Sequence, residues 1–194
     1  GGLILYSTNS GTNWTKQQTN APDAFRDFDM LNSSIGYAVG GNFFTPSGYC
    51  YITINSGANW TSLPIPNPFS QVNSVDFVNI YTGWIAGNAG ISRTTNGGST
   101  WTTQSTIPPP GASAIIEINM GDANTGYCVN SANVWKTTNG GTNWDKINTL
   151  PSGSFFSTIK AFSSTTLFVG GGQKIYKTYN GGATWDSAFM PSGS

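Results

Sequence analysis

The carboxylates are the residues of this sequence best able to do chemistry: one glutamate, Glu117, and seven aspartates. Asp29 and Asp76 stand at the same position of two similar short segments. A glycosidase needs two carboxylates on either side of a sugar, so this pair is a catalytic candidate. Asn119 and Lys160 continue the row in two later segments, however, which favours a ring of polar side chains. We therefore expect no catalytic residue.

Several other chemistries are excluded by the composition. The chain of 194 residues has no histidine, which excludes a Ser-His-Asp triad and a His-ligated metal. Eight Lys+Arg balance eight Asp+Glu, so the chain has no basic footprint for nucleic acid. No apolar run reaches the ~20 residues of a membrane-spanning helix. Cys50 and Cys128 occupy apolar segments without a CxxC pattern, so we expect free, buried thiols and neither a metal nor a cofactor.

An internal repeat supplies the elements that would position these residues. The pattern Ser/Thr-x-Asn-x-Gly-x-x-Trp occurs five times, and its tryptophans are 46, 41, 43 and 41 residues apart. The Asn favours a turn because its side chain can bond its own backbone two residues on, and the Gly takes positive φ without cost. We expect each copy to close a β-hairpin with its tryptophan largely buried over the turn. These structural residues are Asn9, Gly11 and Trp14; Asn55, Gly57 and Trp60; Asn96, Gly98 and Trp101; Asn139, Gly141 and Trp144; and Asn180, Gly182 and Trp185.

Each copy of this turn motif belongs to a longer unit. A short apolar segment precedes the motif, a glycine- and aromatic-containing segment such as Gly83–Gly87 lies before that, and a further short segment such as Val75–Phe77 comes first. A unit therefore has four short strands, A to D, with the motif between C and D. Four strands in roughly 40 to 45 residues is the size of a propeller blade. Gly or Pro interrupts every window that could form a long helix, so we expect an all-β fold.

The motif resembles the Asp-box, or BNR, repeat of β-propellers. With a Gly-Tyr-Ala-Val-Gly segment upstream it is most similar to propellers of the photosystem II assembly-factor type and their secreted bacterial relatives. The resemblance implies the fold but no single function, because sialidases, xyloglucanases, sorting receptors and binding scaffolds share the repeat. All five copies carry Asn where the family often has Asp, which argues against a metal. Arg26 and Arg93 are the only arginines, so neither the sialidase arginine triad nor the assembly-factor arginine patch has a counterpart.

The phase of the repeat predicts four and a half blades in a propeller arc. We expect a half blade at 1–20 and full blades at 21–62, 63–105, 106–148 and 149–194. The tail Met190–Ser194 matches Leu150–Ser154, the link into a following blade. We therefore expect part of a larger propeller, whose remaining blades come from the rest of the chain or from another subunit. The alternatives are an open arc completed by a second chain and a five-blade ring with one incomplete blade.

The D–A and B–C loops share the face opposite the turn motifs, where propellers usually bind, and they carry several aromatic residues. We expect a non-catalytic binding or scaffolding module that holds a partner protein on this face. The alternative is a carbohydrate-binding or glycosidase-type propeller whose catalytic residues lie outside this chain. Few charges among many neutral polar residues are typical of secreted or cell-surface proteins, which is the location we expect. The candidate binding residues are Phe43, Phe44, Phe69, Phe155, Phe156, Asp29 and Asp76.

Overall fold

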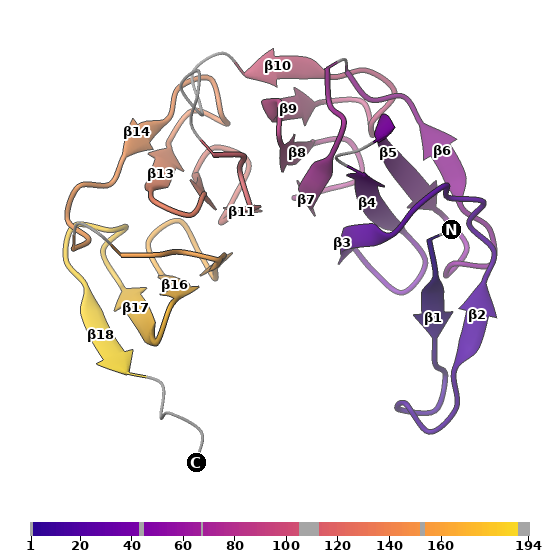
Figure 1. The fold of residues 1–194 in the computed structure, drawn as a ribbon, viewed down its shortest axis with the longest axis horizontal. Helices are drawn as coiled ribbons and strands as arrows, with labels where there is room; N and C mark the ends of the chain where they lie inside the picture. The colour runs from indigo at the N-terminus through magenta and orange to yellow at the C-terminus, as the bar shows by residue number, and fades with distance from the viewer. Residues whose placement is uncertain (1, 43–44, 67, 105–112, 152–153, 190–194) are drawn as a thin grey trace.

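The computed structural model describes residues 2–42, 45–66, 68–104, 113–151 and 154–189, and every regular element in these ranges is a β-strand. The strands form five antiparallel sheets that follow one another along an arc (Figure 1). This arrangement confirms the all-β propeller prediction. The described residues contain no helix long and apolar enough to cross a membrane.

The first sheet has two strands and each of the other four has four. The strands of the five sheets, in chain order, are β1 (Ile4–Tyr6) and β2 (Thr15–Gln17); β3 (Phe25–Met30), β4 (Gly36–Asn42), β5 (Thr45–Thr53) and β6 (Thr61–Leu63); β7 (Val72–Phe77), β8 (Gly83–Gly87), β9 (Gly90–Thr94) and β10 (Thr102–Gln104); β11 (Glu117–Met120), β12 (Gly126–Val129), β13 (Val134–Thr137) and β14 (Asp145–Lys146); and β15 (Thr158–Ala161), β16 (Leu167–Gly171), β17 (Lys174–Thr178) and β18 (Asp186–Phe189). Strand β6 ends one residue beyond the expected blade boundary at 62.

Within each four-stranded sheet the strands pair in sequence order, so each sheet is a meander and one blade. The first strands of the blades, β3, β7, β11 and β15, lie next to one another in succession. They line the concave side of the arc, which we call the inner face (Figure 1). Side chains at the start of these four strands can therefore meet although they are more than 40 residues apart in the chain.

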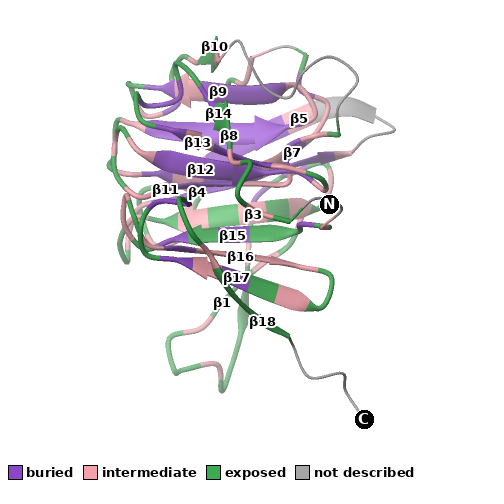
Figure 2. Ribbon diagram, turned by 90° about the vertical axis from the view of Figure 1, so that its left-hand side faces the viewer, coloured by how far each residue is buried: buried purple, intermediate pink, exposed green. Residues whose placement is uncertain are grey.

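Apolar layers between successive blades form the core. Three buried clusters each combine side chains of one blade with side chains of the next. Cys50, Ile91 and Val134 hold the same position in their blades, facing the next blade, and are 1% exposed or less. Ile175 holds that position in the last blade and is 37% exposed, because the described residues include no sheet beyond β18. Figure 2 shows the same gradient, with buried residues in the middle blades and exposed ones in β1 and β18.

Both cysteines are free and buried, which confirms the prediction made from their apolar surroundings. Cys50 belongs to the layer between the second and third sheets, and Cys128 to the layer between the third and fourth. Burial raises the pKa of the Cys50 thiol to about 12, so this thiol stays protonated and unreactive near neutral pH.

All five turn motifs are built by the same short-range hydrogen bonds. In the third copy, Thr94 Oγ1 accepts the N–H of Gly98 at 3.0 Å and donates to Asn96 Oδ1 at 3.0 Å. Asn96 Oδ1 also accepts the N–H of Thr100 at 2.9 Å, four residues on rather than the two residues expected. Equivalent bonds occur in the other copies. Gly98 has φ +87°, a conformation that only glycine adopts without strain.

The expectation that all five motif tryptophans are largely buried is wrong. Trp144 is 6% exposed, whereas three others are half-buried and Trp14 is 60% exposed. Each half-buried indole N–H reaches the outer part of the preceding blade, as where Trp60 Nε1 donates to Gln17 Oε1 at 3.0 Å. Burial of a motif tryptophan therefore depends on the preceding blade. The described residues contain no sheet before β1, so Trp14 has no such neighbour.

Candidate binding site on the inner face

Side chains of the inner strands accept backbone hydrogen bonds from the next blade. These bonds form two parallel rows, because acceptors two residues apart on a strand point the same way. The row that contains the predicted pair consists of Asp29 Oδ2 with the N–H of Phe77, Asp76 Oδ2 with the N–H of Met120, and Asn119 Oδ1 with the N–H of Ala161, each at 2.8 Å. The second row consists of Asp27 Oδ2 with Val75 N–H at 3.0 Å, Ser74 Oγ with Ile118 N–H at 3.3 Å, and Glu117 Oε2 with Ile159 N–H at 2.9 Å.

These bonds give Asp29 and Asp76 a structural role between blades, as a polar ring would. Burial raises the pKa of Asp76 to about 7 and is the largest effect on it. The hydrogen bond from Met120 N–H acts in the opposite direction and lowers this pKa. Burial also raises the pKa of Asp29, while the bond from Phe77 N–H and the nearby Lys160 lower it. Asp76 also accepts a bond from the Asn119 amide at 3.0 Å. Each carboxyl is thus hydrogen-bonded to the backbone of the next blade.

A polar pocket of about 520 Å³ lies at the beginning of three inner strands, on the side of the D–A and B–C loops. Its lining residues are Arg26, Asp27, Gln71, Asn73, Ile116 and Glu117. The exposed side chain of Arg26 is oriented by its Nε–H, which donates to the Gly41 carbonyl at 3.2 Å. Asn73 is oriented in turn, since its amide donates to the Ile115 carbonyl at 2.7 Å. The pocket thus presents a cation, carboxylates and amides in fixed positions.

Sequence reasoning missed this pocket. Its residues come from three blades and stand two to five positions before the row of Asp29, Asp76 and Asn119. An alignment of the inner strands that extended two residues before Asp29, Asp76 and Asn119 would have shown a second polar position. Asp27, Ser74 and Glu117 occupy it. No local motif marks it, because each blade supplies only two residues.

The predicted aromatic binding residues are not gathered into one exposed site. Phe69 and Phe156 are 6% and 3% exposed and belong to two different core clusters, so neither is available as an anchor. Phe156 is buried because its ring packs on Tyr176, with the two ring centroids 6.1 Å apart. Phe155 is exposed. Phe43 and Phe44 lie outside the described residues.

Four-stranded meander blades arranged around a shared inner face define this chain as a β-propeller of the BNR-repeat type. A family model described as photosynthesis system II assembly factor YCF48 matches residues 5–188, nearly the whole chain. The chain belongs to this family. A search of curated proteins found no match.

Solved structures with the same fold include members of this family and glycoside hydrolases. YCF48 from Cyanidioschyzon merolae superposes with a TM-score of 0.67 at 18% identity, over 96% of this chain and 66% of that one. A structure described as YCF48 bound to D1 peptide has a TM-score of 0.55 at 15% identity, over 84% of this chain and 81% of that one. A GH74 enzyme from Niastella koreensis has a TM-score of 0.55 at 14% identity, over 86% of this chain and 38% of that one. These likenesses concern the fold alone.

Proposed function

We propose that this chain is a non-catalytic propeller module that binds an extended segment of a partner protein in the polar pocket beside Arg26. The observation that carries the proposal is the pocket itself, where oriented donors and acceptors from three blades meet in one cavity of about 520 Å³. Membership of the YCF48 family supports a peptide as the ligand, since one YCF48 structure is described as bound to D1 peptide.

The chemistry of the pocket suits a polypeptide backbone. The guanidinium of Arg26 can donate to peptide carbonyls, while Glu117, which holds Ile159 N–H through Oε2, can accept a peptide N–H group at its other carboxylate oxygen. Because these charges are of opposite sign within one pocket, the site has no strong field of either sign. Binding should therefore rest on hydrogen bonds and change little between low and high salt.

A peptide array followed by fluorescence anisotropy tests the proposal. Peptides that bind the chain should lose roughly tenfold or more in affinity with Arg26→Ala or Asn73→Ala. Lys146→Ala removes a cation from the exposed outer strand β14 and is the control that should leave affinity unchanged. Peptide affinity that is unchanged by both pocket variants would rule out this site.

We also propose that the chain does not hydrolyse glycosides. The support is that Asp29 and Asp76 are each held by a backbone N–H of the next blade, an arrangement unsuited to transferring a proton to a sugar. The alternative is a carbohydrate-binding or glycosidase-type propeller whose catalytic residues lie outside this chain, and the fold likeness to GH74 enzymes raises it. Turnover of xyloglucan that disappears in Asp29→Asn or Asp76→Asn would favour the alternative, as would selective binding on a glycan array.

The location that we propose is secreted or cell-surface, on the basis of the composition, in which only 8% of residues are charged. Fractionation of the source cells, with detection by an antibody against the chain, tests this. Recovery of the protein in the cytoplasmic fraction alone would contradict it.

A further inference from the structure

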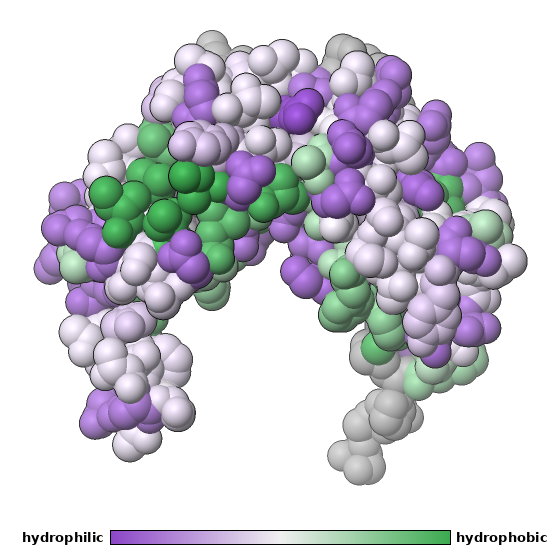
Figure 3. Space-filling model, turned by 180° about the vertical axis from the view of Figure 1, so that it is seen from behind, coloured by the Kyte–Doolittle hydropathy of each residue, from purple (hydrophilic) through white to green (hydrophobic). Residues whose placement is uncertain are grey.

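An apolar groove of about 450 Å³ lies between the first and second sheets. Its walls come from β1 on one side and from β3 on the other, and none of the buried core clusters includes a residue of β1. Figure 3 shows the first sheet as the narrow arm at the lower left, with open space on its concave side. We call this the half-blade groove; its apolar lining includes Leu3, Leu5, Tyr6, Phe25, Phe28 and Met30.

Phe28 and Met30 are far more exposed than their counterparts in the later blades. They are 68% and 41% exposed, whereas every counterpart is 8% exposed or less. The counterparts are Val75, Ile118 and Ile159 for Phe28, and Phe77, Met120 and Ala161 for Met30. Strands A and B of the preceding blade cover these positions, as where β3 and β4 both lie against β7. In the described residues the first sheet has only two strands, so β3 has no such cover.

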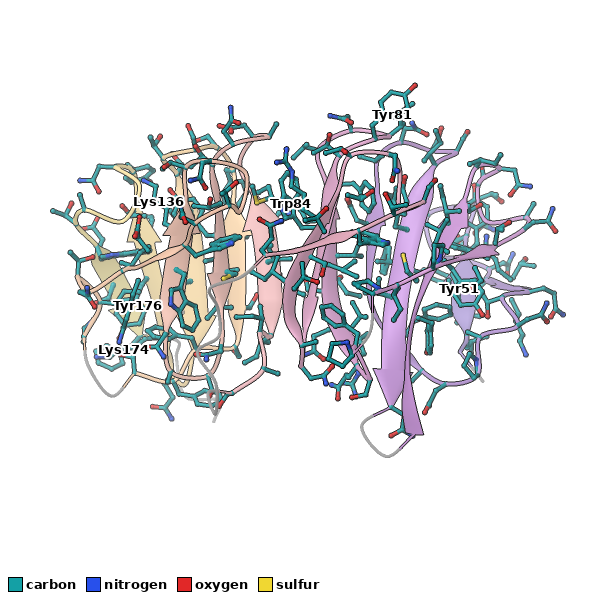
Figure 4. All side chains as sticks on the ribbon, turned by 90° about the horizontal axis from the view of Figure 1, so that it is seen from above. Tyr51, Tyr81, Trp84, Lys136, Lys174 and Tyr176 are labelled. Atoms are coloured by element: carbon teal, nitrogen blue, oxygen red, sulfur yellow. The ribbon has the colours of Figure 1, made fainter. Side chains whose placement is uncertain are left out.

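Strand B of the preceding blade places an aromatic side chain in this layer. The ring of Tyr37 in β4 stacks on Phe77, with ring centroids 3.5 Å apart and an angle of 3° between the ring planes. Trp84 of β8, labelled in Figure 4, is fully buried against the fourth sheet, where its Nε1 donates to the Gly140 carbonyl at 3.0 Å. An aromatic side chain is therefore the group that would cover Met30.

Strand β1 has an unpaired backbone edge beside the groove. The equivalent strands β5, β9, β13 and β17 each pair with strand B on one side and strand D on the other. In the described residues β1 pairs only with β2. The N–H and C=O groups along such an edge are a template for an added strand. The groove therefore offers apolar positions and a backbone edge together.

The pairing in the other blades indicates which residue would lie opposite β1. In the third sheet Trp84 is opposite Arg93, whose position in β1 is held by Tyr6. In the second sheet Tyr37 is opposite Ile52, at the same position. We therefore expect an aromatic residue opposite Tyr6 in any strand that extends the first sheet.

A β-hairpin with the pattern of strands A and B fits the groove better than other occupants. A small apolar molecule or a helix could cover Phe28 and Met30 but would leave the edge of β1 unpaired. A second copy of this chain is a poor donor, because each A–B pair in its described residues already belongs to a blade. We propose that the half-blade groove binds a β-hairpin of a partner polypeptide, whose strand B pairs with β1.

A synthetic, fluorescently labelled peptide of residues 72–87 is the probe for this site. This segment contains β7 and β8, and in the chain it packs on Ile118 and Met120, the counterparts of Phe28 and Met30. Fluorescence anisotropy should show saturable binding of the peptide to the chain. The Trp84→Ser peptide should bind at least roughly tenfold more weakly, because it lacks the aromatic side chain.

Variants of the chain locate the binding. Phe28→Asp or Met30→Asp should weaken binding of the unchanged peptide at least roughly tenfold. Neither residue lines the polar pocket beside Arg26, so these variants test the groove and not the proposed peptide site. Phe162→Asp is the matched control, because Phe162 is 67% exposed in the last blade. This control should bind the peptide like the unchanged chain.

Hydrogen exchange of the unchanged chain provides an independent readout. The peptide should slow exchange of the backbone amides of β1, because a strand added to its edge supplies their hydrogen-bond partners. A small apolar ligand would not have this effect. The proposal is overturned if the peptide does not bind, if both aspartate variants of the groove bind it normally, if Phe162→Asp weakens binding as much as they do, or if exchange slows in the last blade in place of β1.

Discussion

At the residue scale, Asp76 couples the stability of the blade interface to pH. The folded chain holds this carboxyl with a pKa of about 7, above its ordinary 3.8, chiefly because the side chain is buried. The folded state therefore binds more protons than the unfolded state between these two values. The stabilisation that Asp76 contributes is therefore fully present below about pH 4 and is lost as pH rises through about 7. Asp29 contributes in the same direction, since burial also raises its pKa.

Asp76→Asn should flatten this dependence. The amide can still accept the Met120 N–H but cannot ionise, so the decline of the unfolding free energy between pH 4.5 and pH 8 should become shallower. Urea denaturation at both pH values measures the slope, which matters more than the absolute stability because the variant also changes the contact with Asn119. An equal slope in both proteins would contradict the assignment.

The motif tryptophans should differ in energetic weight according to their burial. Trp144→Ala removes a ring that is 6% exposed and belongs to a core cluster, so it should cost roughly 3–5 kcal/mol of unfolding free energy. Trp14→Ala removes a ring that is 60% exposed and should cost less than about 1 kcal/mol. Chemical denaturation of the two variants compares them directly. Similar losses would show that the indole acts within its own turn and not against the preceding blade.

At the element scale, the hydroxyl of the first residue stabilises each turn motif. Thr94 Oγ1 accepts the buried N–H of Gly98, so its removal leaves a buried donor without a partner. Thr94→Ala should therefore cost roughly 1–3 kcal/mol. The adjacent, exposed Thr95 is the matched control, and Thr95→Ala should change stability by less than about 0.5 kcal/mol. Thermal and urea unfolding check the pair, and equal losses would refute the hydroxyl's role.

At the scale of the whole molecule, stability should grade from the middle of the arc to its ends. The third and fourth sheets are covered by apolar layers on both sides and the last blade on one, whereas none of the buried clusters includes a residue of β1 or β2. Hydrogen exchange should protect backbone amides of β8 and β12 most and those of β1 and β18 least. Uniform protection across all five sheets would show that the arc opens only as a unit.

The repeat determined most of the fold from the sequence alone. The turn motif is held by bonds that span four residues or fewer, so the residue types at those spacings suffice to predict it. The period of 41 to 46 residues then predicts four strands per unit and hence the blades. Apolar positions within the strands also predicted correctly that Cys50 and Cys128 are buried and free.

Tertiary structure alone decided which of the repeated positions are covered and which residues meet. Trp14 and Trp144 have identical local roles, yet only Trp144 is buried, because a preceding blade covers it. Adjacent Phe155 and Phe156 read alike in sequence, but one ring is exposed and the other packs on Tyr176. The polar pocket and the hydrogen bonds of Asp29 and Asp76 both join residues of different blades. These features exist because the blades stack on one another. Stacking brings together segments more than 40 residues apart, and no local spacing of residues encodes such a contact.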